Sequence, residues 1–89
     1  MEFEWDDSKN ESNSKKHGID FNDAKEVFKD DNSKIAPDLR KDYGEERWKI
    51  IGKIYGILIS VIYTVRNNAT RIISARRASL IERNEYYNK

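Results

Sequence analysis

The chain has 89 residues, a length that corresponds to one domain with one modest hydrophobic core. It has no cysteine, which excludes a disulfide framework and a zinc–thiolate site. The polar first 20 residues lack the apolar segment of a secretory signal, and the longest nearly apolar run, 54–63, is about half the length of a membrane span. We therefore expect one cytoplasmic domain over residues 1–89, without membrane contact.

The net charge of +1 hides an uneven distribution of charge along the chain. Residues 1–46 hold 8 Lys/Arg and 14 Asp/Glu, a net charge of −6, whereas residues 47–89 hold 9 and 2, a net charge of +7. Most basic residues of the second half are arginines, whose planar fork binds phosphate bidentately. This pattern favours a polyanion or an acidic partner for the C-terminal half, and equally a domain whose charges balance internally.

A short edge strand and two helices are predicted in the N-terminal half. The strand covers residues 2–5. The first helix, largely polar, begins after the N-cap residues 6–8 and ends before Gly18, a suitable C-terminal stop. Asp20 caps the second helix, which ends by residues 30–33 and has apolar residues at helical spacing: Phe21, Ala24, Val27 and Phe28.

Strands dominate the remaining residues. Residues 34–37 predict a short edge strand, because Pro37 cannot donate a hydrogen bond to a neighbour. Three longer strands follow at 48–54, 57–65 and 69–75, and the pairs between them, Tyr55-Gly56 and Asn67-Asn68, favour tight turns. A capping box, Ser79 to Glu82, opens a C-terminal helix. The whole predicts an α+β fold with an antiparallel meander.

Two-residue turns would determine which side chains share a face of the sheet, because Ile54 would then face Ile57 and Arg66 would face Ala69. The first face, which the second helix would cover, collects Trp48, Ile50, Ile54, Ile57, Ile59, Val61, Tyr63, Val65 and Ile72. The second face, with five cations and no acid, collects Arg47, Lys49, Ile51, Lys53, Leu58, Ser60, Ile62, Thr64, Arg66, Arg71, Ile73 and Ala75.

The second face predicts a surface that binds phosphate groups, which provide most of the affinity for nucleic acids. The alternative is an ordinary exposed face that is neutralised by acidic residues of the first helix or of a partner. Arg76 and Arg77 lie where the last strand leads into the C-terminal helix. A guanidinium and helix amides could share a phosphate there, or the pair simply flanks the end of a strand.

Two sets of residues, together spanning nearly the whole chain, match one family pattern. The N-terminal set comprises residues 3–6, 9–10, 16–21, 24 and 27–28. The second set comprises residues 38, 44–48, 51–52, 61–64, 66, 71–78, 82–83 and 86. In order and spacing, they resemble the BrnT family of toxins, a branch of the RelE-like ribonuclease toxins. The run from Arg71 to Ala78 is the most specific part of this resemblance.

The resemblance implies an RNA endonuclease that blocks translation and is neutralised by a BrnA-like antitoxin with a ribbon-helix-helix domain. It also implies a heterotetramer of two toxins and two antitoxins that represses its own operon, with operator DNA contacted only through the antitoxin. The implied RelE-like fold packs the N-terminal helices and the C-terminal helix on an antiparallel four-stranded sheet. The other face of that sheet would bind RNA.

Neither metal-ligand spacing nor a glycine-rich nucleotide loop is present, so we expect no metal and no cofactor. A metal-independent ribonuclease uses the RNA 2′-hydroxyl to attack the adjacent phosphate. It needs a base for that hydroxyl, an acid for the leaving oxygen, and cations for the charge that develops on the phosphate. The candidate cations are Arg47, Arg66, Arg71 and Arg76.

The proton-transfer groups are less specific. Glu45 and Glu46, which adjoin Arg47, are candidate bases, Glu46 first among them, and equally partners for an ion pair or charges in a turn. His17, the only histidine, suits proton transfer and equally the end of a helix. The residues predicted to bind RNA are Lys49, Lys53, Thr64 and Arg77. The alternative function is a non-catalytic, arginine-rich module that binds an acidic protein or a nucleic acid.

Overall fold

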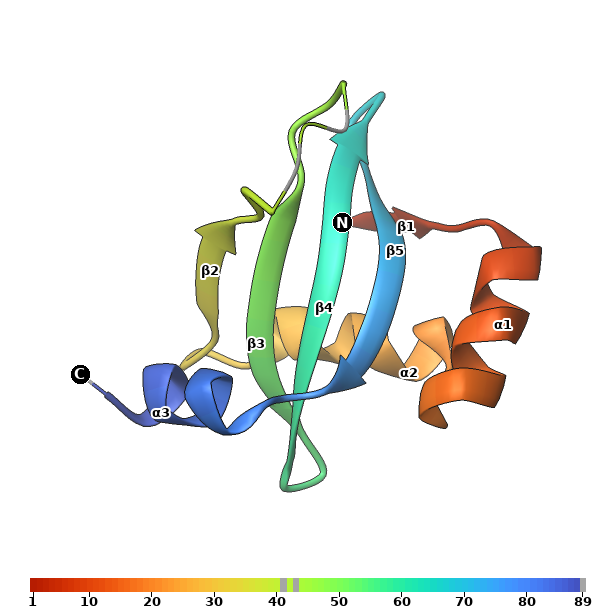
Figure 1. The fold of residues 1–89 in the computed structure, drawn as a ribbon. Coiled ribbons are helices and arrows are strands. Elements are labelled where there is room, and N and C mark those ends of the chain that lie inside the picture. Colours follow the sequence, from red (N-terminus) through yellow and green to blue (C-terminus); the bar gives the residue numbers. More distant parts are fainter. Residues whose placement is uncertain (41, 43, 89) are drawn as a thin grey trace.

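The computed structural model describes residues 1–40, 42 and 44–88 (Figure 1). Its elements are, in order, β1 (Glu2–Glu4), α1 (Asp7–His17), α2 (Phe21–Ala24), the 3-10 helix η1 (Lys25–Lys29), β2 (Lys34–Pro37), β3 (Trp48–Ile54), β4 (Ile57–Arg66), β5 (Ala69–Arg77) and α3 (Leu80–Tyr87). The order confirms the α+β prediction. The second predicted helix is α-helical only in its first turn and continues as η1.

Five strands form one mixed sheet within the described residues, in the order β1-β5-β4-β3-β2. Strands β2 to β5 pair antiparallel, whereas β1 pairs parallel with β5. The predicted antiparallel strands are thus present as β2 to β5, but the prediction of a four-stranded, fully antiparallel sheet was wrong, because β1 adds a fifth, parallel strand. The three residues of β1 do not encode their direction, which depends on where the chain enters the sheet.

Both predicted hairpin turns are confirmed. Tyr55 and Gly56 have φ angles of 49° and 81°, and Asn67 and Asn68 have 51° and 67°. Two consecutive left-handed residues form the type of turn whose twist matches that of the flanking strands. The expected pairs follow, with Ile54 opposite Ile57 and Arg66 opposite Ala69.

The predicted helix ends are also present. The Asp6 side chain accepts a hydrogen bond from the backbone N–H of Lys9, and Gly18 ends α1 at a φ of 71°. Ser79 and Glu82 form a reciprocal capping box at the start of α3. Each side chain satisfies a backbone N–H that the helix leaves unpaired.

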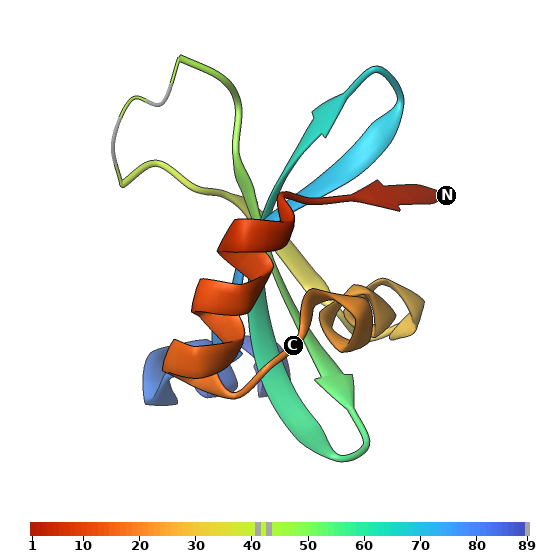
Figure 2. The ribbon, with the colours of Figure 1, turned by 90° about the vertical axis from the view of Figure 1, so that its right-hand side faces the viewer.

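Helices cover both faces of the sheet. The prediction that all helices lie on one face was therefore wrong. On one face, α2 and η1 bury Phe21, Ala24 and Val27 against the sheet. On the other face, Tyr86 of α3 packs with Ile51 and Leu58. Figure 2 shows α3 and the α2–η1 segment on opposite sides of the strands. The second face needs this cover because it carries apolar side chains as well as cations.

Strand β5 contains a β-bulge that the sequence analysis did not anticipate. Tyr63 pairs with Ile72, but Ile62 pairs with Ser74, so Ile73 is an extra residue. An extra residue turns every later side chain of a strand to the opposite face. Ala75 is therefore buried in the core under α2, not on the cationic face as predicted. Two further residues predicted for the core face, Ile57 and Val65, lie at the strand ends and are exposed.

Asn13 of α1 holds β5 just beyond this bulge. Its side-chain Nδ2 donates to the Ala75 carbonyl oxygen at 2.8 Å, and its Oδ1 accepts from the Ala75 backbone N–H at 3.1 Å. Nδ2 also donates to the Ile19 carbonyl oxygen at 3.0 Å. The buried amide thus replaces a neighbouring strand at this edge, and it anchors an otherwise polar helix.

The longest described helix, α1, has 11 residues, and none of the described helices is long and apolar enough to cross a membrane.

We predict that Asn13→Ala destabilises the fold by about 1–3 kcal/mol, because it leaves the buried N–H and carbonyl of Ala75 without partners. Urea denaturation followed by circular dichroism measures the change. Ser12→Ala, at an exposed position of the same helix, is the control and should change the free energy of unfolding little. Equal stability of the two variants would contradict the role assigned to Asn13.

We predict that Gly52→Ala also lowers stability. A Cβ at Gly52 would lie 2.8 Å from Cβ of Val27 and 3.0 Å from its carbonyl oxygen, so η1 would have to move away from β3. Overpacking of this kind costs about 1–3 kcal/mol. Thermal denaturation tests it against Lys34→Ala on the exposed edge strand. An unchanged melting temperature would show that η1 tolerates the displacement.

Candidate functional site

The face of the sheet that α3 covers in part, here called the α3 face, carries cations from three adjacent strands. Strand alternation and pairing place these polar side chains on it: Lys49 and Lys53 of β3, Ser60, Thr64 and Arg66 of β4, and Arg71 and Arg76 of β5. Arg71 lies opposite Thr64, two residues from the predicted pair of Arg66 with Ala69. Arg76 joins this face only because the bulge at Ile73 changes the alternation of β5.

Glu45 joins two of the arginines near the end of β4. Its carboxylate lies 2.7 Å from Nη2 of Arg66 and 3.2 Å from Nε of Arg47. The adjacent residue, Glu46, has an exposed side chain, and its backbone oxygen accepts a hydrogen bond of 2.6 Å from the Thr64 hydroxyl. The segment that precedes β3 is therefore tied to the α3 face by a side chain and by its backbone.

Arg71 is paired with a residue from the other end of the chain. Its Nη1 lies 2.7 Å from Oε2 of Glu4, the neighbouring residue on β1. This pair and the Glu45 pairs join the acidic N-terminal half to the basic C-terminal half. The charges thus balance partly within the chain, the alternative that composition left open. The carboxylates come from β1 and from the segment before β3, not from the first helix.

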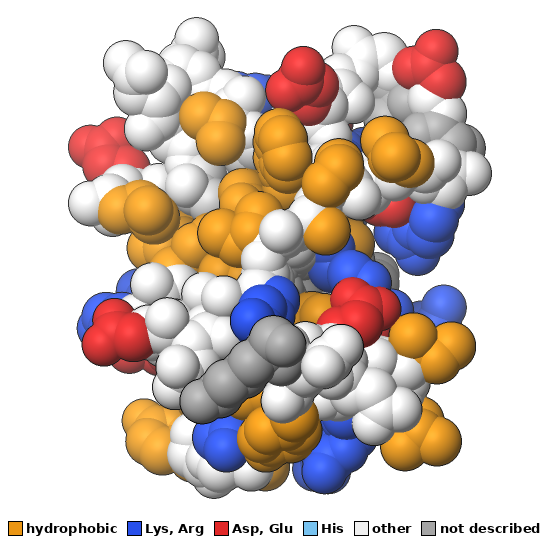
Figure 3. Space-filling model, turned by 90° about the vertical axis from the view of Figure 1, so that its left-hand side faces the viewer, with side chains coloured by type: hydrophobic (Ala, Val, Ile, Leu, Met, Phe, Trp, Pro, Cys, Tyr) orange, Lys and Arg blue, Asp and Glu red, His pale blue; other side chains and the backbone are white. Residues whose placement is uncertain are grey.

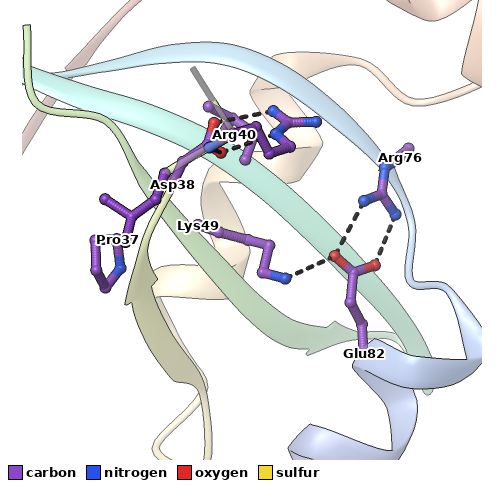
Figure 4. A pocket seen from close by; sticks show the side chains of 8 residues that line it. Pro37, Asp38, Arg40, Lys49, Arg76 and Glu82 are labelled. Carbon is purple, nitrogen blue, oxygen red and sulfur yellow. Dashed lines mark hydrogen bonds and ion pairs between the residues drawn. The ribbon is translucent and has the colours of Figure 1, made fainter. Parts of the chain in front are cut away.

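Glu82 of α3 forms the most buried ion pairs of this face. Arg76 donates to both carboxylate oxygens, at 2.6 and 3.0 Å, and Nζ of Lys49 lies 3.1 Å from Oε2. Oε2 also accepts from the Ser60 hydroxyl at 3.0 Å, and Oε1 from the backbone N–H of Ser79 at 2.8 Å. Only 4% of the Glu82 side chain is exposed. The site thus combines β3, β4, β5 and the first turn of α3 (Figure 4).

Two hollows open on this side of the molecule. The first, of about 340 Å³, is lined by Pro37, Asp38, Leu39, Arg40, Lys49, Ile62, Arg76 and Glu82. The second, of about 350 Å³, is lined by Pro37, Asp38, Leu39, Asp42, Glu45, Glu46, Arg47 and Trp48. They share residues 37–39, and so lie next to each other. Figure 3, which shows the molecule from the side on which β2 lies, has acidic and basic side chains beside one another among apolar and uncharged ones.

A surface of arginines that alternate with carboxylates is compatible with several ligands, and comparison with known families decides between them. The chain matches the family described as the ribonuclease toxin BrnT of type II toxin–antitoxin systems over residues 5–82, which are 78 of its 89 residues. The chain belongs to the BrnT family. It is therefore a ribonuclease toxin of a type II toxin–antitoxin system, as the resemblance implied. No curated protein matches the chain significantly.

Not all predicted site residues of the toxin lie together. Arg47, Arg66, Arg71, Arg76, Lys49 and Thr64 are on or beside the α3 face. Lys53 lies at its far end, with Nζ 5.2 Å from the ring centre of Tyr87. His17 and Arg77 instead line a separate hollow beside Ile57, where β4 begins. Arg66 is nine residues further along β4, roughly 30 Å at the usual rise per residue. The structure thus separates His17 from the arginines near the end of β4.

Two of the carboxylates that organise this site, Glu82 and Glu4, had no predicted role in it. Glu82 forms the predicted capping box, and its second role depends on a strand that is distant in sequence, whereas Glu4 was predicted only as part of a strand. For Glu45, the ion pair with Arg47 is one of the two alternatives that the sequence left open. Asp38, buried and bound by Arg40 through two hydrogen bonds of 2.8 and 2.9 Å, matched the family pattern but had no assigned role.

The ion pairs change the acidity of two carboxylates. Hydrogen bonds from Arg66 lower the pKa of Glu45 most; burial opposes this effect, and Arg47 adds to the lowering. Burial raises the pKa of Glu82, but hydrogen bonds from Arg76, the Ser79 backbone and Lys49 outweigh it and lower the pKa to about 2. Both groups are thus ionised at neutral pH.

Among the described residues, no three His, Asp or Glu side chains gather closely enough to hold a metal ion.

We predict that Glu82 causes the stability of the toxin to fall as the pH becomes acidic. Its folded pKa of about 2 lies below the ordinary value of 4.5, so its contribution is complete above pH 4.5 and is lost as the pH falls toward 2. The contribution is on the order of 3 kcal/mol. The difference in unfolding free energy between wild type and Glu82→Gln should therefore shrink between pH 5 and pH 2.5. The control, Glu85→Gln at an exposed position of α3, should show a much smaller pH dependence.

Proposed function

We propose that the toxin cleaves RNA on the α3 face without a metal ion. A ribose 2′-hydroxyl gives up its proton and attacks the adjacent phosphate, the bond from phosphorus to the 5′-oxygen breaks, and the leaving oxygen takes up a proton, which leaves a 2′,3′-cyclic phosphate and a 5′-hydroxyl. One observation carries this proposal: five cations converge on or beside this face around the hydroxyls of Thr64 and Ser60. They are Arg47, Lys49, Arg66, Arg71 and Arg76. Such an arrangement suits a phosphodiester, because charge develops on its non-bridging oxygens as the new bond forms.

The cations fall into two groups that suit successive segments of an RNA backbone. Arg47, Arg66 and Arg71 lie near Thr64, while Lys49 and Arg76 lie near Ser60. Thr64 lies four positions after Ser60 on β4, about 13 Å at the usual rise of a strand. We infer that one group binds the reacting phosphate and the other binds a neighbouring one. The two adjoining hollows would leave room for the chain between them.

The paired carboxylates moderate the charge of this face. The five cations and the three carboxylates of Glu4, Glu45 and Glu82 together have a formal charge of +2. Affinity for RNA depends on released counter-ions and therefore on net positive charge. We infer modest affinity for free RNA. The ion pairs orient the arginines, but they also lower the net positive charge that would strengthen the binding of RNA.

Glu46 is our candidate for the base that accepts the proton of the 2′-hydroxyl. The hydrogen bond from Thr64 to its backbone holds the residue at the edge of the arginine group, and its side chain is exposed to a substrate. Glu45 suits this role less, because Arg66 and Arg47 bind its carboxylate and lower its pKa. A lowered pKa makes a carboxylate a weaker proton acceptor.

The partner of the toxin follows from its family. A type II system pairs the toxin with a protein antitoxin. We propose, on the resemblance, that this antitoxin is BrnA-like with a ribbon-helix-helix domain, and that two toxins and two antitoxins form a cytoplasmic heterotetramer. In this proposal the complex represses its own operon, and the released toxin blocks translation by cutting RNA. Co-purification with the product of an adjacent gene, followed by mass measurement of the complex, would test the stoichiometry.

We predict that Arg47→Ala and Arg71→Ala each lower cleavage by about 10²-fold, the usual effect of removing one donor to a developing oxyanion. Growth arrest should be lost in parallel. Primer extension on RNA from cells that express each variant measures discrete cleavage sites. Lys16→Ala on α1, an exposed cation away from the α3 face, is the matched control and should cleave like wild type.

The same variants test the alternative function, a non-catalytic binding module. The ion pairs with Glu4 and Glu45 are compatible with this function. These pairs show that the arginines accept carboxylate partners, as an acidic protein would provide. Loss of partner binding in both variants, with no discrete RNA ends from wild type, would favour a non-catalytic binding module. Loss of cleavage with retained partner binding would support the nuclease.

A further inference from the structure

We propose that Glu82 is a positioning residue that holds Arg76 with one edge of its guanidinium turned toward a single phosphodiester of the RNA. The proposal rests on the proposed function of the α3 face and adds a residue and a phosphate site to it. Some N–H groups of Arg76 are already bound within the protein, and the others are available to a ligand. Glu82 itself would not touch the substrate.

Arg76 uses only part of its donor capacity within the protein. Its two terminal nitrogens donate to the two oxygens of Glu82, and Nη1 also donates to the Arg77 carbonyl oxygen at 3.2 Å. A guanidinium has five N–H groups in a fixed plane. The remaining two, on Nε and Nη2, lie on the same edge and point in parallel, the geometry that grips a phosphate bidentately.

This second edge of Arg76 is open to a ligand. Among the described residues, none accepts a hydrogen bond from Nε of Arg76, and no buried side-chain nitrogen or oxygen lacks a partner. The edge therefore faces solvent, in agreement with the 39% exposure of the side chain. Arg76 lines the hollow of about 340 Å³, near the lower limit of small-molecule sites.

Glu82 is held firmly enough to orient its partner. Its carboxylate accepts hydrogen bonds from Ser60 of β4 and from the Ser79 backbone, and it is paired with Lys49 of β3. Because the group is almost fully buried, any rotation away from these donors would leave an unpaired charge without water. Arg76 is thus attached to a fixed anchor, and its free edge has a defined direction.

The charge of the hollow suits one phosphodiester. Among the described residues, its lining includes three cations, Arg40, Lys49 and Arg76, and two carboxylates, Asp38 and Glu82, which together have a formal charge of +1. A phosphodiester carries a single negative charge. Figure 4 shows both carboxylates already bound by the cations beside them, so a phosphate would meet bound carboxylates rather than two free ones.

A double-mutant cycle tests the positioning role, with kcat and KM measured on a short RNA that the wild type cleaves. We expect Glu82→Gln to lower kcat/KM by about 10- to 100-fold, the effect of a small displacement of a binding group. Arg76→Ala should lower it at least as much, and adding Glu82→Gln to Arg76→Ala should lower it no further. A merely structural role of Glu82 would lower activity equally in both backgrounds, which would overturn the proposal. Glu85→Gln is the matched control on α3.

A binding measurement separates this inference from the cleavage mechanism. The probe is an RNA of the same sequence whose 2′-hydroxyls are replaced by hydrogen, so that it binds without reaction. We expect it to shift the ¹⁵Nε–¹H signal of Arg76 in the wild type, and to shift it several-fold less at equal concentration in Glu82→Gln. If this signal does not respond in the wild type, the phosphate site is wrong even where cleavage occurs.

The remaining outcomes are equally decisive. Unchanged or increased cleavage in Glu82→Gln would mean that Glu82 is dispensable or competes with RNA, and would overturn the positioning role. If Glu82→Gln does not fold, Glu82→Asp replaces it in both experiments, with a smaller loss expected because it keeps the charge and shifts the anchor. If the wild type makes no discrete cuts but the Arg76 signal responds as expected, the proposed cleavage mechanism fails while the phosphate site stands.

Discussion

The candidate site depends on one extra residue in β5. The bulge at Ile73 turns Ala75 into the core and brings Arg76 to the α3 face, opposite Ser60. Without it, Arg76 would lie opposite Ile59, on the face that α2 and η1 cover. Asn13 holds the strand immediately after the bulge by pairing with both backbone groups of Ala75. A helix with almost no apolar face thus contributes to the site through one amide.

The arginines of this toxin are arranged by carboxylates rather than gathered as a bare basic patch. Glu4, Glu45 and Glu82 bind Arg71, Arg66 and Arg76 from three different elements. The partly exposed pairs of Glu4 and Glu45 add little to stability, so their main consequence is orientation, whereas the buried Glu82 contributes to stability as well. A nuclease benefits from this, because a guanidinium already in place loses less conformational freedom when the charged transition state forms.

Family membership and geometry support different parts of the functional conclusion. Membership of the BrnT family establishes the ribonuclease toxin and the kind of system to which it belongs. The geometry places the arginines near the end of β4 apart from His17, which lines a separate hollow. The mechanism that we propose for the α3 face therefore uses arginines, a carboxylate and the substrate's own hydroxyl.

The sequence alone determined those structural features whose causes lie in residues adjacent along the chain. Turn residues at 55–56 and 67–68, the N-caps at Asp6 and Asp20, and the apolar stripe of the second helix predicted elements that the structure contains, because their causes are local. The direction of β1, the bulge at Ile73 and the side of the sheet on which α3 lies could not be predicted in this way. They depend on contacts between distant residues, such as Asn13 with Ala75 and Glu82 with Ser60. The cationic face was therefore predictable as a pattern of alternation, whereas the position of Arg76 on it was decided only by tertiary packing.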